Sequence, residues 1–176
     1  MPAFPVLNFK EWIDENRHLL KPPVGNKVVY QNTDNFIVMV VGGPNQRDDY
    51  HYNETEEFFY MLEGDMTLKI QEDGKPVDVP IKEGEIFLLP PKVPHSPQRT
   101  AGSIGLVIER NRDKGMQDGL MWFCRNCNNK LHEKYFPLLN IETQLKESIE
   151  DFYDSEDLRT CTNCGTVMPV PDKMKK

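Results

Sequence analysis

The sequence predicts a mainly β fold: one small barrel or jelly roll, with a helix before it and a small metal-binding subdomain after it. The first observation is a series of short segments between residues 27 and 123 that are rich in β-branched and aromatic residues. The second is the set of turn signals between them, at 63–65, 73–74 and 83–84, with no helical pattern intervening. Many short strands joined by tight turns favour a barrel or jelly roll. The third is a change of composition after Gly119, where two cysteine pairs appear.

The segment before the barrel, residues 8–20, predicts an amphipathic helix. Asn8 can cap its start, and Glu11, three residues later, can complete a capping box. Apolar residues then recur at helical spacing along one side. Lys-Pro-Pro at 21–23 should end the helix, because proline cannot continue the hydrogen-bond ladder.

Seven strands are expected in the barrel. They cover residues 27–31, 36–43, 57–62, 66–71, 76–81, 85–90 and 104–110. Asp73-Gly74 predicts a two-residue hairpin, since glycine accepts the positive φ that such a turn requires. The mouth of a small barrel can hold one small ligand. We expect residues 1–118 to form the helix and barrel, and residues 119–176 to form a separate subdomain that includes a helix near 140–153.

The charge balance argues against several classes of partner. The 176 residues contain 28 Asp and Glu against 21 Lys and Arg, for a net charge of −7. Such a chain has little general affinity for nucleic acid or anionic lipid. No apolar run reaches the length of a membrane span, and the N-terminus lacks a signal-peptide pattern. We therefore expect a cytoplasmic protein with reduced cysteines and no nucleic-acid or membrane partner.

A candidate metal site comes from His51, Glu57 and His95, all in or beside short β-type segments. Two imidazoles and one carboxylate form the ligand set that leaves positions open on a non-haem iron(II) centre. Arg47 shares strand parity with His51, and Arg99 shares it with His95, so each arginine could face the site. Taken singly, either histidine is better explained as an ordinary loop or turn residue, and Glu57 could be an edge charge. The joint pattern favours the site.

The two segments that carry these residues are similar to the two cupin motifs. Glu57 followed by Gly64 matches the end of the first motif, and Gly84, Pro90 and His95 match the second. The resemblance implies a single cupin jelly-roll barrel. Two departures stand out: Asn53 replaces the usual second histidine of the first motif, and Lys92 replaces the usual glycine after Pro90.

Further segments resemble the 3-hydroxyanthranilate 3,4-dioxygenase family. They are HLLKPPVGN (18–26), VVGGPNQRDDYH (40–51), EEFFY (56–60), PHSPQR (94–99) and VIER (107–110), together with the cysteine pairs. The resemblance implies an Fe(II)-dependent, extradiol-type enzyme, expected as a homodimer. Its substrates would be 3-hydroxyanthranilate and O2, and its product 2-amino-3-carboxymuconate semialdehyde. That step lies on the kynurenine route from tryptophan to quinolinate and NAD.

The same resemblance implies roles for individual residues. His51, Glu57 and His95 would hold the iron, with Glu57 also bordering the bound substrate. Arg47 and Arg99 would bind the substrate carboxylate through their planar forks of donors. Glu109 would hold the amino or hydroxyl group and take a proton. Asn26 would add a hydrogen bond from the Pro-Pro loop, which could close as a lid. Without the resemblance, Asn26 is better explained as a turn residue, and Arg47 and Glu109 could equally be exposed charges.

The C-terminal cysteines form a second candidate metal site. Cys124 and Cys127 make one Cys-x-x-Cys pair, and Cys161 and Cys164 make another. Four thiolates can close a tetrahedron around one ion, with a structural role, and Gly165 permits a tight turn after the second pair. Zinc and iron both accept this geometry, and the family resemblance adds weight to iron. The alternative is four thiols or disulfides without a metal.

Two other functions compete with a dioxygenase. A non-enzymatic cupin with a zinc ribbon could sense a small ligand or bind a protein, but it needs no open metal position beside paired arginines. A phosphosugar isomerase would be expected to keep the histidine that Asn53 replaces. We therefore favour the ring-cleaving dioxygenase.

Overall fold

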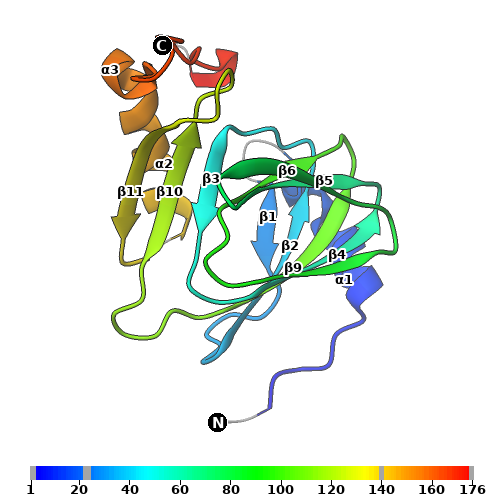
Figure 1. The fold of residues 1–176 in the computed structure, drawn as a ribbon. Helices are drawn as coiled ribbons and strands as arrows, with labels where there is room; N and C mark the ends of the chain where they lie inside the picture. Colours follow the sequence, from blue (N-terminus) through cyan, green and yellow to red (C-terminus); the bar gives the residue numbers. More distant parts are fainter. Residues whose placement is uncertain (1–2, 22–24, 139–140, 175–176) are drawn as a thin grey trace.

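A computed structural model describes residues 3–21, 25–138 and 141–174. Two antiparallel sheets face each other as a flattened barrel, helix α1 (Phe9–Asn16) lies against one side, and the C-terminal helices lie at one end (Figure 1). The mainly β architecture is therefore the one that the sequence predicts. None of the helices in these ranges is long and apolar enough to cross a membrane.

The first sheet has five strands in the order β1-β2-β9-β4-β7. Their bounds are β1 (Asn26–Val28), β2 (Phe36–Gly42), β9 (Ile104–Arg110), β4 (Glu57–Glu63) and β7 (Ile86–Leu89). All five correspond to predicted segments, because their core-facing positions are apolar and alternate with more exposed ones. Strands distant in sequence are neighbours here, as the jelly-roll prediction requires.

The second sheet has six strands in the order β11-β10-β3-β8-β5-β6. They are β11 (Lys130–Phe136), β10 (Asp118–Phe123), β3 (Asp49–Tyr52), β8 (His95–Arg99), β5 (Met66–Glu72) and β6 (Lys75–Ile81). Only β5 and β6 were among the predicted strands. They form the expected hairpin: Glu72 pairs with Lys75, and Asp73 and Gly74 between them have φ of 49° and 74°.

The barrel core lies between the two sheets. Phe59 and Met61 of β4 are buried against Met66 and Leu68 of β5, with side chains from β2, β6, β7 and β9 completing the cluster. Apolar side chains meeting between the sheets hold them together by removing apolar area from water. The end of the barrel next to β3 and β8 carries polar side chains instead.

Helix α1 covers the outer face of the five-stranded sheet. The Asn8 side chain accepts a hydrogen bond from the Glu11 backbone N–H at 3.3 Å, which confirms the predicted cap. Ile13 packs with Val40 and Ile104 of the sheet. The helix is shorter than predicted, because Arg17–Leu19 tightens into a 3₁₀ turn. Pro22 and Pro23, expected to end it, lie outside the described residues.

The C-terminal part continues the second sheet. β10 pairs with β3 on one side and β11 on the other, so the expected boundary at 118/119 coincides with the start of a barrel-paired strand. Helices α2 (Ile141–Asp154) and α3 (Glu156–Arg159), with the 3₁₀ turn Asp172–Met174, complete this part. Trp122 is fully buried there and stacks on Phe152 of α2 at 4.3 Å between ring centroids. The division into two subdomains remains a prediction.

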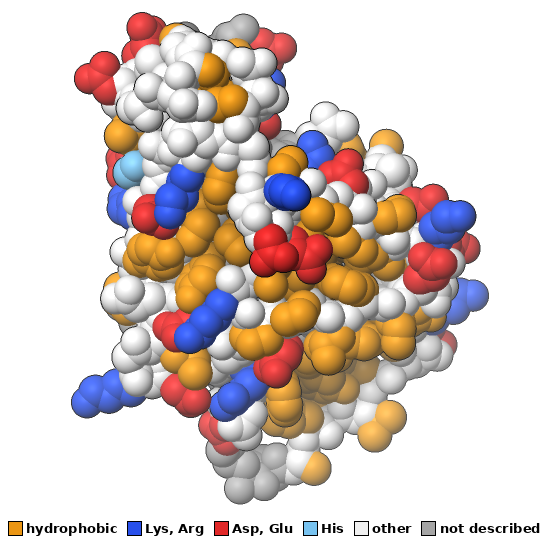
Figure 2. Space-filling model, viewed as in Figure 1, with side chains coloured by type: hydrophobic (Ala, Val, Ile, Leu, Met, Phe, Trp, Pro, Cys, Tyr) orange, Lys and Arg blue, Asp and Glu red, His pale blue; other side chains and the backbone are white. Residues whose placement is uncertain are grey.

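One face of the molecule carries many apolar side chains. In the view of Figure 2 they spread over the barrel, interrupted by single acidic and basic side chains. The C-terminal end shows mainly backbone and uncharged, non-hydrophobic side chains in the same view, with few hydrophobic ones.

Candidate active site

His51, Glu57 and His95 come together at one end of the barrel from both sheets. His51 of β3 and His95 of β8 are directly opposite each other, with ring centroids 5.2 Å apart. Glu57 opens β4 in the other sheet, and its Oε2 lies 3.0 Å from His95 Nε2. All three side chains are buried, and one ligand atom from each lies within 4.8 Å of the others. This arrangement could hold one metal ion.

The hydrogen bonds of the two imidazoles fit metal binding. His95 Nδ1 donates to the Val93 carbonyl at 3.0 Å, which leaves Nε2, the atom near Glu57, to face a metal ion. Burial alone would lower the pKa of His95, but the Glu57 carboxylate outweighs burial and raises it, so a metal ion would replace the proton on Nε2. His51 Nε2 lies 2.7 Å from Asp118 Oδ2 and donates to it, which leaves the lone pair on Nδ1. Metal-binding histidines ordinarily donate their second nitrogen to such an acceptor. Burial lowers the pKa of His51 despite the Asp118 hydrogen bond, and a neutral ring is the form that ligates.

Glu57 is the buried anion of the site. Burial alone would raise its pKa, but His95 and His51 outweigh burial and hold the pKa below its usual value. Asn53 Nδ2 donates to Glu57 Oε2 at 3.4 Å, while Asn53 Oδ1 accepts from the Thr55 N–H at 2.7 Å. The asparagine at the position of the usual cupin histidine therefore supports the carboxylate and the turn before β4.

Arg99 is a buried cation without an anion of its own. It follows His95 by four residues on β8, and its side chain is 3% exposed. Its Nη1 lies 3.5 Å from Met61 Sδ, and its Nε has no hydrogen-bond partner among the described residues. Burial lowers the pKa of Arg99 to about 10, partly offset by Glu57. Because a buried unpaired charge is costly, this guanidinium is suited to an anionic ligand.

Room for the Arg99 fork depends on Gly105 of β9. A Cβ added at Gly105 would lie 2.5 Å from Arg99 Nη1 and 3.1 Å from Met61 Sδ. The glycine therefore leaves the space that the guanidinium occupies.

Arg47 precedes β3 and is already paired. Its Nε donates to Asp49 Oδ2 at 2.8 Å, and its backbone carbonyl accepts from Gln98 Nε2 at 2.9 Å. Burial would lower its pKa, but the Asp49 charge and hydrogen bond outweigh burial and raise it. The negative charge of Glu57 also raises the pKa of Arg47. Arg47 is thus held charged beside β8, the strand that carries His95 and Arg99.

Glu109 of β9 lies opposite Glu57 in the strand register and is 3% exposed. Burial and the Glu57 charge raise its pKa to about 7, although Arg112 acts in the opposite direction. Arg112 Nη1 donates to Glu109 Oε2 at 2.5 Å, and Arg112 Nε donates to Asp118 Oδ1 at 2.7 Å. Since Asp118 also accepts from His51, one chain of hydrogen bonds joins the histidine to Glu109.

Arg112 and Asp118 escaped the sequence interpretation. They lie between the end of β9 and the start of β10, where no motif marks them. The one available signal was the spacing of Arg112, three residues after Glu109, and it is a weak one. The role of Asp118 becomes visible through its long-range hydrogen bond with His51, and that of Arg112 through its hydrogen bonds to Glu109 and Asp118.

Asn26 lies at the start of β1, paired with Val41 of β2, with its side chain half-buried. Its proposed contact with substrate remains a prediction. The Pro-Pro part of the loop before it lies outside the described residues.

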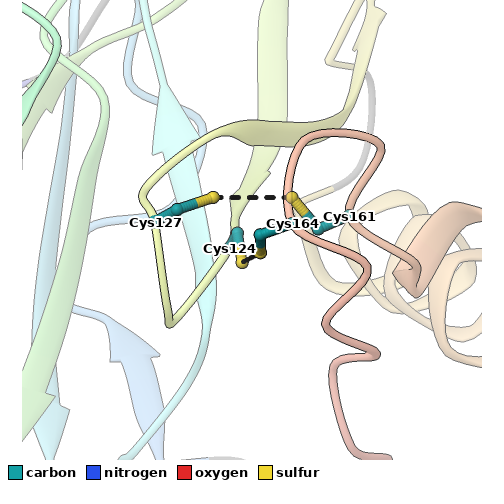
Figure 3. A group of neighbouring side chains, drawn as sticks. All are labelled: Cys124, Cys127, Cys161 and Cys164. Atoms are coloured by element: carbon teal, nitrogen blue, oxygen red, sulfur yellow. Dashed lines mark hydrogen bonds between the residues drawn. The ribbon is translucent and has the colours of Figure 1, made fainter.

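The four cysteines converge at the end of β10, two from each loop, as Figure 3 shows. Cys124 and Cys164 Sγ are 3.6 Å apart, as are Cys127 and Cys161 Sγ. A tetrahedron with metal–sulfur bonds near 2.3 Å has edges of about 3.8 Å, so these separations suit a common ion better than disulfides. Hydrogen bonds with Thr166 lower the pKa of the exposed Cys164 thiol to about 5, whereas burial raises that of Cys124 to about 11.

The two cysteine loops share one backbone design. In each, the carbonyl of the first cysteine accepts from the N–H four residues later, at Asn128 and Gly165. Both of these residues have positive φ, 57° and 72°. Gly165 was expected in this role; Asn128 was not, although asparagine tolerates this conformation well.

Comparison with known proteins identifies the family. Residues 1–153 match the model of the 3-hydroxyanthranilic acid dioxygenase family. The chain is 60% identical over 169 residues to 3-hydroxyanthranilate 3,4-dioxygenase of Xanthomonas campestris pv. campestris (strain 8004), covering 96% of this chain and 95% of that one. It is 55% identical over 170 residues to the enzyme of the same name from Jannaschia sp. (strain CCS1), covering 96% and 94%.

Among solved structures, a cupin-2 domain protein from Shewanella frigidimarina is similar, with a TM-score of 0.48 and 19% identity over 60% of this chain and 95% of that chain. The two facing antiparallel sheets, the N-terminal helix and the four-cysteine cluster make up the predicted cupin architecture. The chain belongs to the 3-hydroxyanthranilate 3,4-dioxygenase family.

Proposed function

We propose that this protein catalyses oxidative ring cleavage of 3-hydroxyanthranilate by O2, at an iron(II) centre held by His51, Glu57 and His95. The product is 2-amino-3-carboxymuconate semialdehyde. The observation that carries the proposal is Arg99, a guanidinium buried beside the metal-ligand cluster with no anionic partner among the described residues. An aromatic substrate that bears a carboxylate supplies the missing charge.

The ligand set supports the choice of iron. Two neutral imidazoles and one carboxylate leave adjacent positions open for a substrate and for dioxygen. When bound, iron(II) supplies the electron transfer between ring and dioxygen that spin rules otherwise make very slow. The protein supplies binding, orientation and proton handling.

Arg99 and Arg47 orient the substrate through its carboxylate. Arg99 offers an unpaired Nε–H donor in a dry environment, where charge-assisted hydrogen bonds are strong. Arg47 is fixed by Asp49 and adds positive charge at the border of the site. With the carboxylate held on this side, the amino group on the adjacent ring carbon and the hydroxyl group on the carbon after it would face the metal ligands.

Glu109 takes the proton that the substrate hydroxyl loses. Its pKa of about 7 is suited to a general base near neutral pH. Arg112 hydrogen-bonds to Oε2, so Oε1 is the oxygen expected to accept the proton. Asn26 is proposed to add one hydrogen bond from the start of β1, next to a loop that could close over the substrate.

The four-cysteine centre is proposed to hold iron or zinc in a structural role. Four thiolates fill a tetrahedron and leave no position for substrate. The ion would tie the loop after β10 to the loop after α3, two segments more than thirty residues apart in sequence.

The protein is proposed to act as a homodimer. Apolar side chains on the outer face of the five-stranded sheet support this, with Ile86, Leu88 and Phe36 being 65%, 59% and 53% exposed. Exposed apolar clusters of this kind commonly mark protein interfaces. Light scattering on the native protein and on Leu88→Lys tests this proposal: a dimer that becomes a monomer supports it, and a monomeric native protein contradicts it.

The activity is tested by anaerobic loading with Fe(II), addition of 3-hydroxyanthranilate, and admission of oxygen. We expect the near-ultraviolet band of the ring-opened product to appear with one O2 consumed per product. His51→Ala removes one of three ligands and should abolish both iron binding at this site and turnover. The matched control is His18→Ala, since His18 is exposed on the turn after α1. Absence of turnover with iron demonstrably bound would overturn the substrate assignment and favour a ligand-sensing cupin.

A further inference from the structure

The first cysteine pair lies against the segment that carries Arg47. Cys124 follows directly on β10, and Trp122 of β10 is paired with Asp49, the first residue of β3. The knuckle that starts at Cys124 therefore begins beside the point where β3 begins. Arg47 is two residues from that point.

A clasp of three side chains joins the knuckle to this segment. Arg125, between the two cysteines of the first pair, donates from Nε and Nη2 to Asp48 Oδ1 at 3.1 and 2.7 Å, and from Nη2 to Oδ2 at 2.7 Å. Tyr153 of α2 donates its hydroxyl to Asp48 Oδ2 at 3.2 Å. We call Arg125, Asp48 and Tyr153 the Arg125 clasp. It holds one carboxylate from two sides.

A second attachment fixes the same knuckle to the barrel. The Asn128 and Gln71 side-chain amides pair with each other, at 3.0 and 3.1 Å, and Asn128 Nδ2 also donates to the Gly74 carbonyl at 3.1 Å. Gln71 and Gly74 belong to the β5–β6 hairpin. Because the knuckle is anchored at this hairpin, it can act as a fixed support for Asp48.

Asp48 and Asp49, adjacent in the chain, accept hydrogen bonds from two different arginines, Arg125 and Arg47. Asp48 contacts the clasp, and Asp49, 2% exposed, binds Arg47 Nε inside the protein. Holding Asp48 therefore restrains the backbone from which both Arg47 and Asp49 project. The Gln98 contacts to the Arg47 backbone N–H and carbonyl restrain the same segment from β8.

We propose that the Arg125 clasp is a positioning device for substrate recognition: it couples the four-cysteine knuckle to Arg47 and sets the affinity for the substrate carboxylate. This inference rests on the proposed role of Arg47 in carboxylate binding. It assigns the cysteine centre an effect on substrate affinity, with no part in the chemical step.

The test compares Arg125→Ala and Asp48→Asn with the native protein, using two ligands. 3-Hydroxyanthranilate carries the carboxylate, and 2-aminophenol lacks it but keeps the adjacent hydroxyl and amino groups. Dissociation constants are measured by calorimetry without oxygen, and KM and kcat for 3-hydroxyanthranilate are measured with oxygen. Metal content is determined for each variant. The matched control is Lys134→Ala, which removes an exposed ion pair between β11 and Asp151 of α2.

For Arg125→Ala we expect the dissociation constant and KM for 3-hydroxyanthranilate to rise about fivefold, the size expected for a partly exposed, bidentate ion pair. The kcat, the 2-aminophenol affinity and the content of both metals should stay within twofold of the native values. Asp48→Asn should reproduce the result, and Lys134→Ala should change nothing. Equal losses for the two ligands, an unchanged KM, or a fall in kcat alone would each overturn the inference.

Arg47→Ala separates this inference from the function on which it rests. If Arg47→Ala weakens 3-hydroxyanthranilate but not 2-aminophenol, Arg47 binds the carboxylate, and an unaffected Arg125→Ala then refutes the clasp alone. If Arg47→Ala affects both ligands equally or neither, the role of Arg47 itself is wrong. In that case the proposed role of the Arg125 clasp is also refuted, whatever the result for Arg125→Ala.

Discussion

Replacing Arg99 by methionine is expected to stabilise the fold while removing substrate binding. The native side chain is 3% exposed, and burial lowers its pKa from 12.5 to about 10. A shift of that size means that the folded environment disfavours the charged form by about 3 kcal/mol. Methionine has a similar reach and would lie beside Met61 and the register partner Met66. Allowing for imperfect packing, we expect the free energy of unfolding to rise by about 2 kcal/mol.

The kinetic expectation for Arg99→Met has the opposite sign. Losing charge-assisted hydrogen bonds to the substrate carboxylate costs about 3 kcal/mol, which lowers kcat/KM about 100-fold. Most of the loss should appear in KM, because the carboxylate is bound in the ground state as well. Stability is measured by denaturant unfolding of the metal-free protein, followed by tryptophan fluorescence, and kinetics by product absorbance with iron bound.

Arg110→Met is the control for Arg99→Met. Arg110 is the last residue of β9. Its side chain is 46% exposed and forms an ion pair with Asp113. Both its stability and its kcat/KM should remain close to native. A drop in stability of more than about 1 kcal/mol in Arg99→Met would show that Arg99 has a stabilising partner and would refute the reasoning. An unchanged KM would remove Arg99 from the carboxylate site.

Three further outcomes follow from the site. Asp118→Asn removes the charged acceptor of His51 and should weaken metal binding about 10- to 100-fold in a chelator competition; unchanged affinity would contradict this. The kcat/KM should rise with pH through about 7, because Glu109 must lose its proton to act as a base, and Glu109→Gln should be slow and lack this ionisation in its pH profile. Cys164→Ser should lose the second metal and lower the melting temperature by several degrees in calorimetry, whereas retention of both metals would argue against a four-thiolate site.

Sequence patterns located those strands whose inner faces are apolar. β4 and β9 follow the alternation that a half-buried strand requires, and β5 and β6 are joined by a turn that glycine makes obvious. β3 and β8 escaped because their sequences, DYHY and HSPQR, place polar side chains toward the interior. Their inward-facing polar side chains make these two strands invisible to a search for hydrophobic alternation, and the same side chains form the candidate site.

Motif spacing predicted the candidate metal ligands, but it did not predict the residues that support them. His51, Glu57 and His95, and the four cysteines, were predicted from spacing, and the structure brings each set together. Asp118 and the Arg125 clasp depend on pairings between distant segments, which a single sequence does not encode locally. Arg112 has local partners, Glu109 and Asp118, but no motif marks it. Lys92 stands where the cupin motif has glycine. Its φ is 66°, so the backbone keeps the positive-φ conformation that glycine favours although the residue has changed.

Asn53 explains how the altered cupin motif suits a chelating substrate. An octahedral metal ion has six positions, and a substrate that binds through two adjacent groups needs two of them while dioxygen needs a third. Three protein ligands leave those three positions, whereas a fourth histidine would leave two. Asn53 is buried, and its amide is committed to Glu57 and to the turn at Thr55. If His51, Glu57 and His95 hold the ion as proposed, the substitution keeps the local support and removes one ligand, so that the number of open positions would equal the number that the proposed reaction uses.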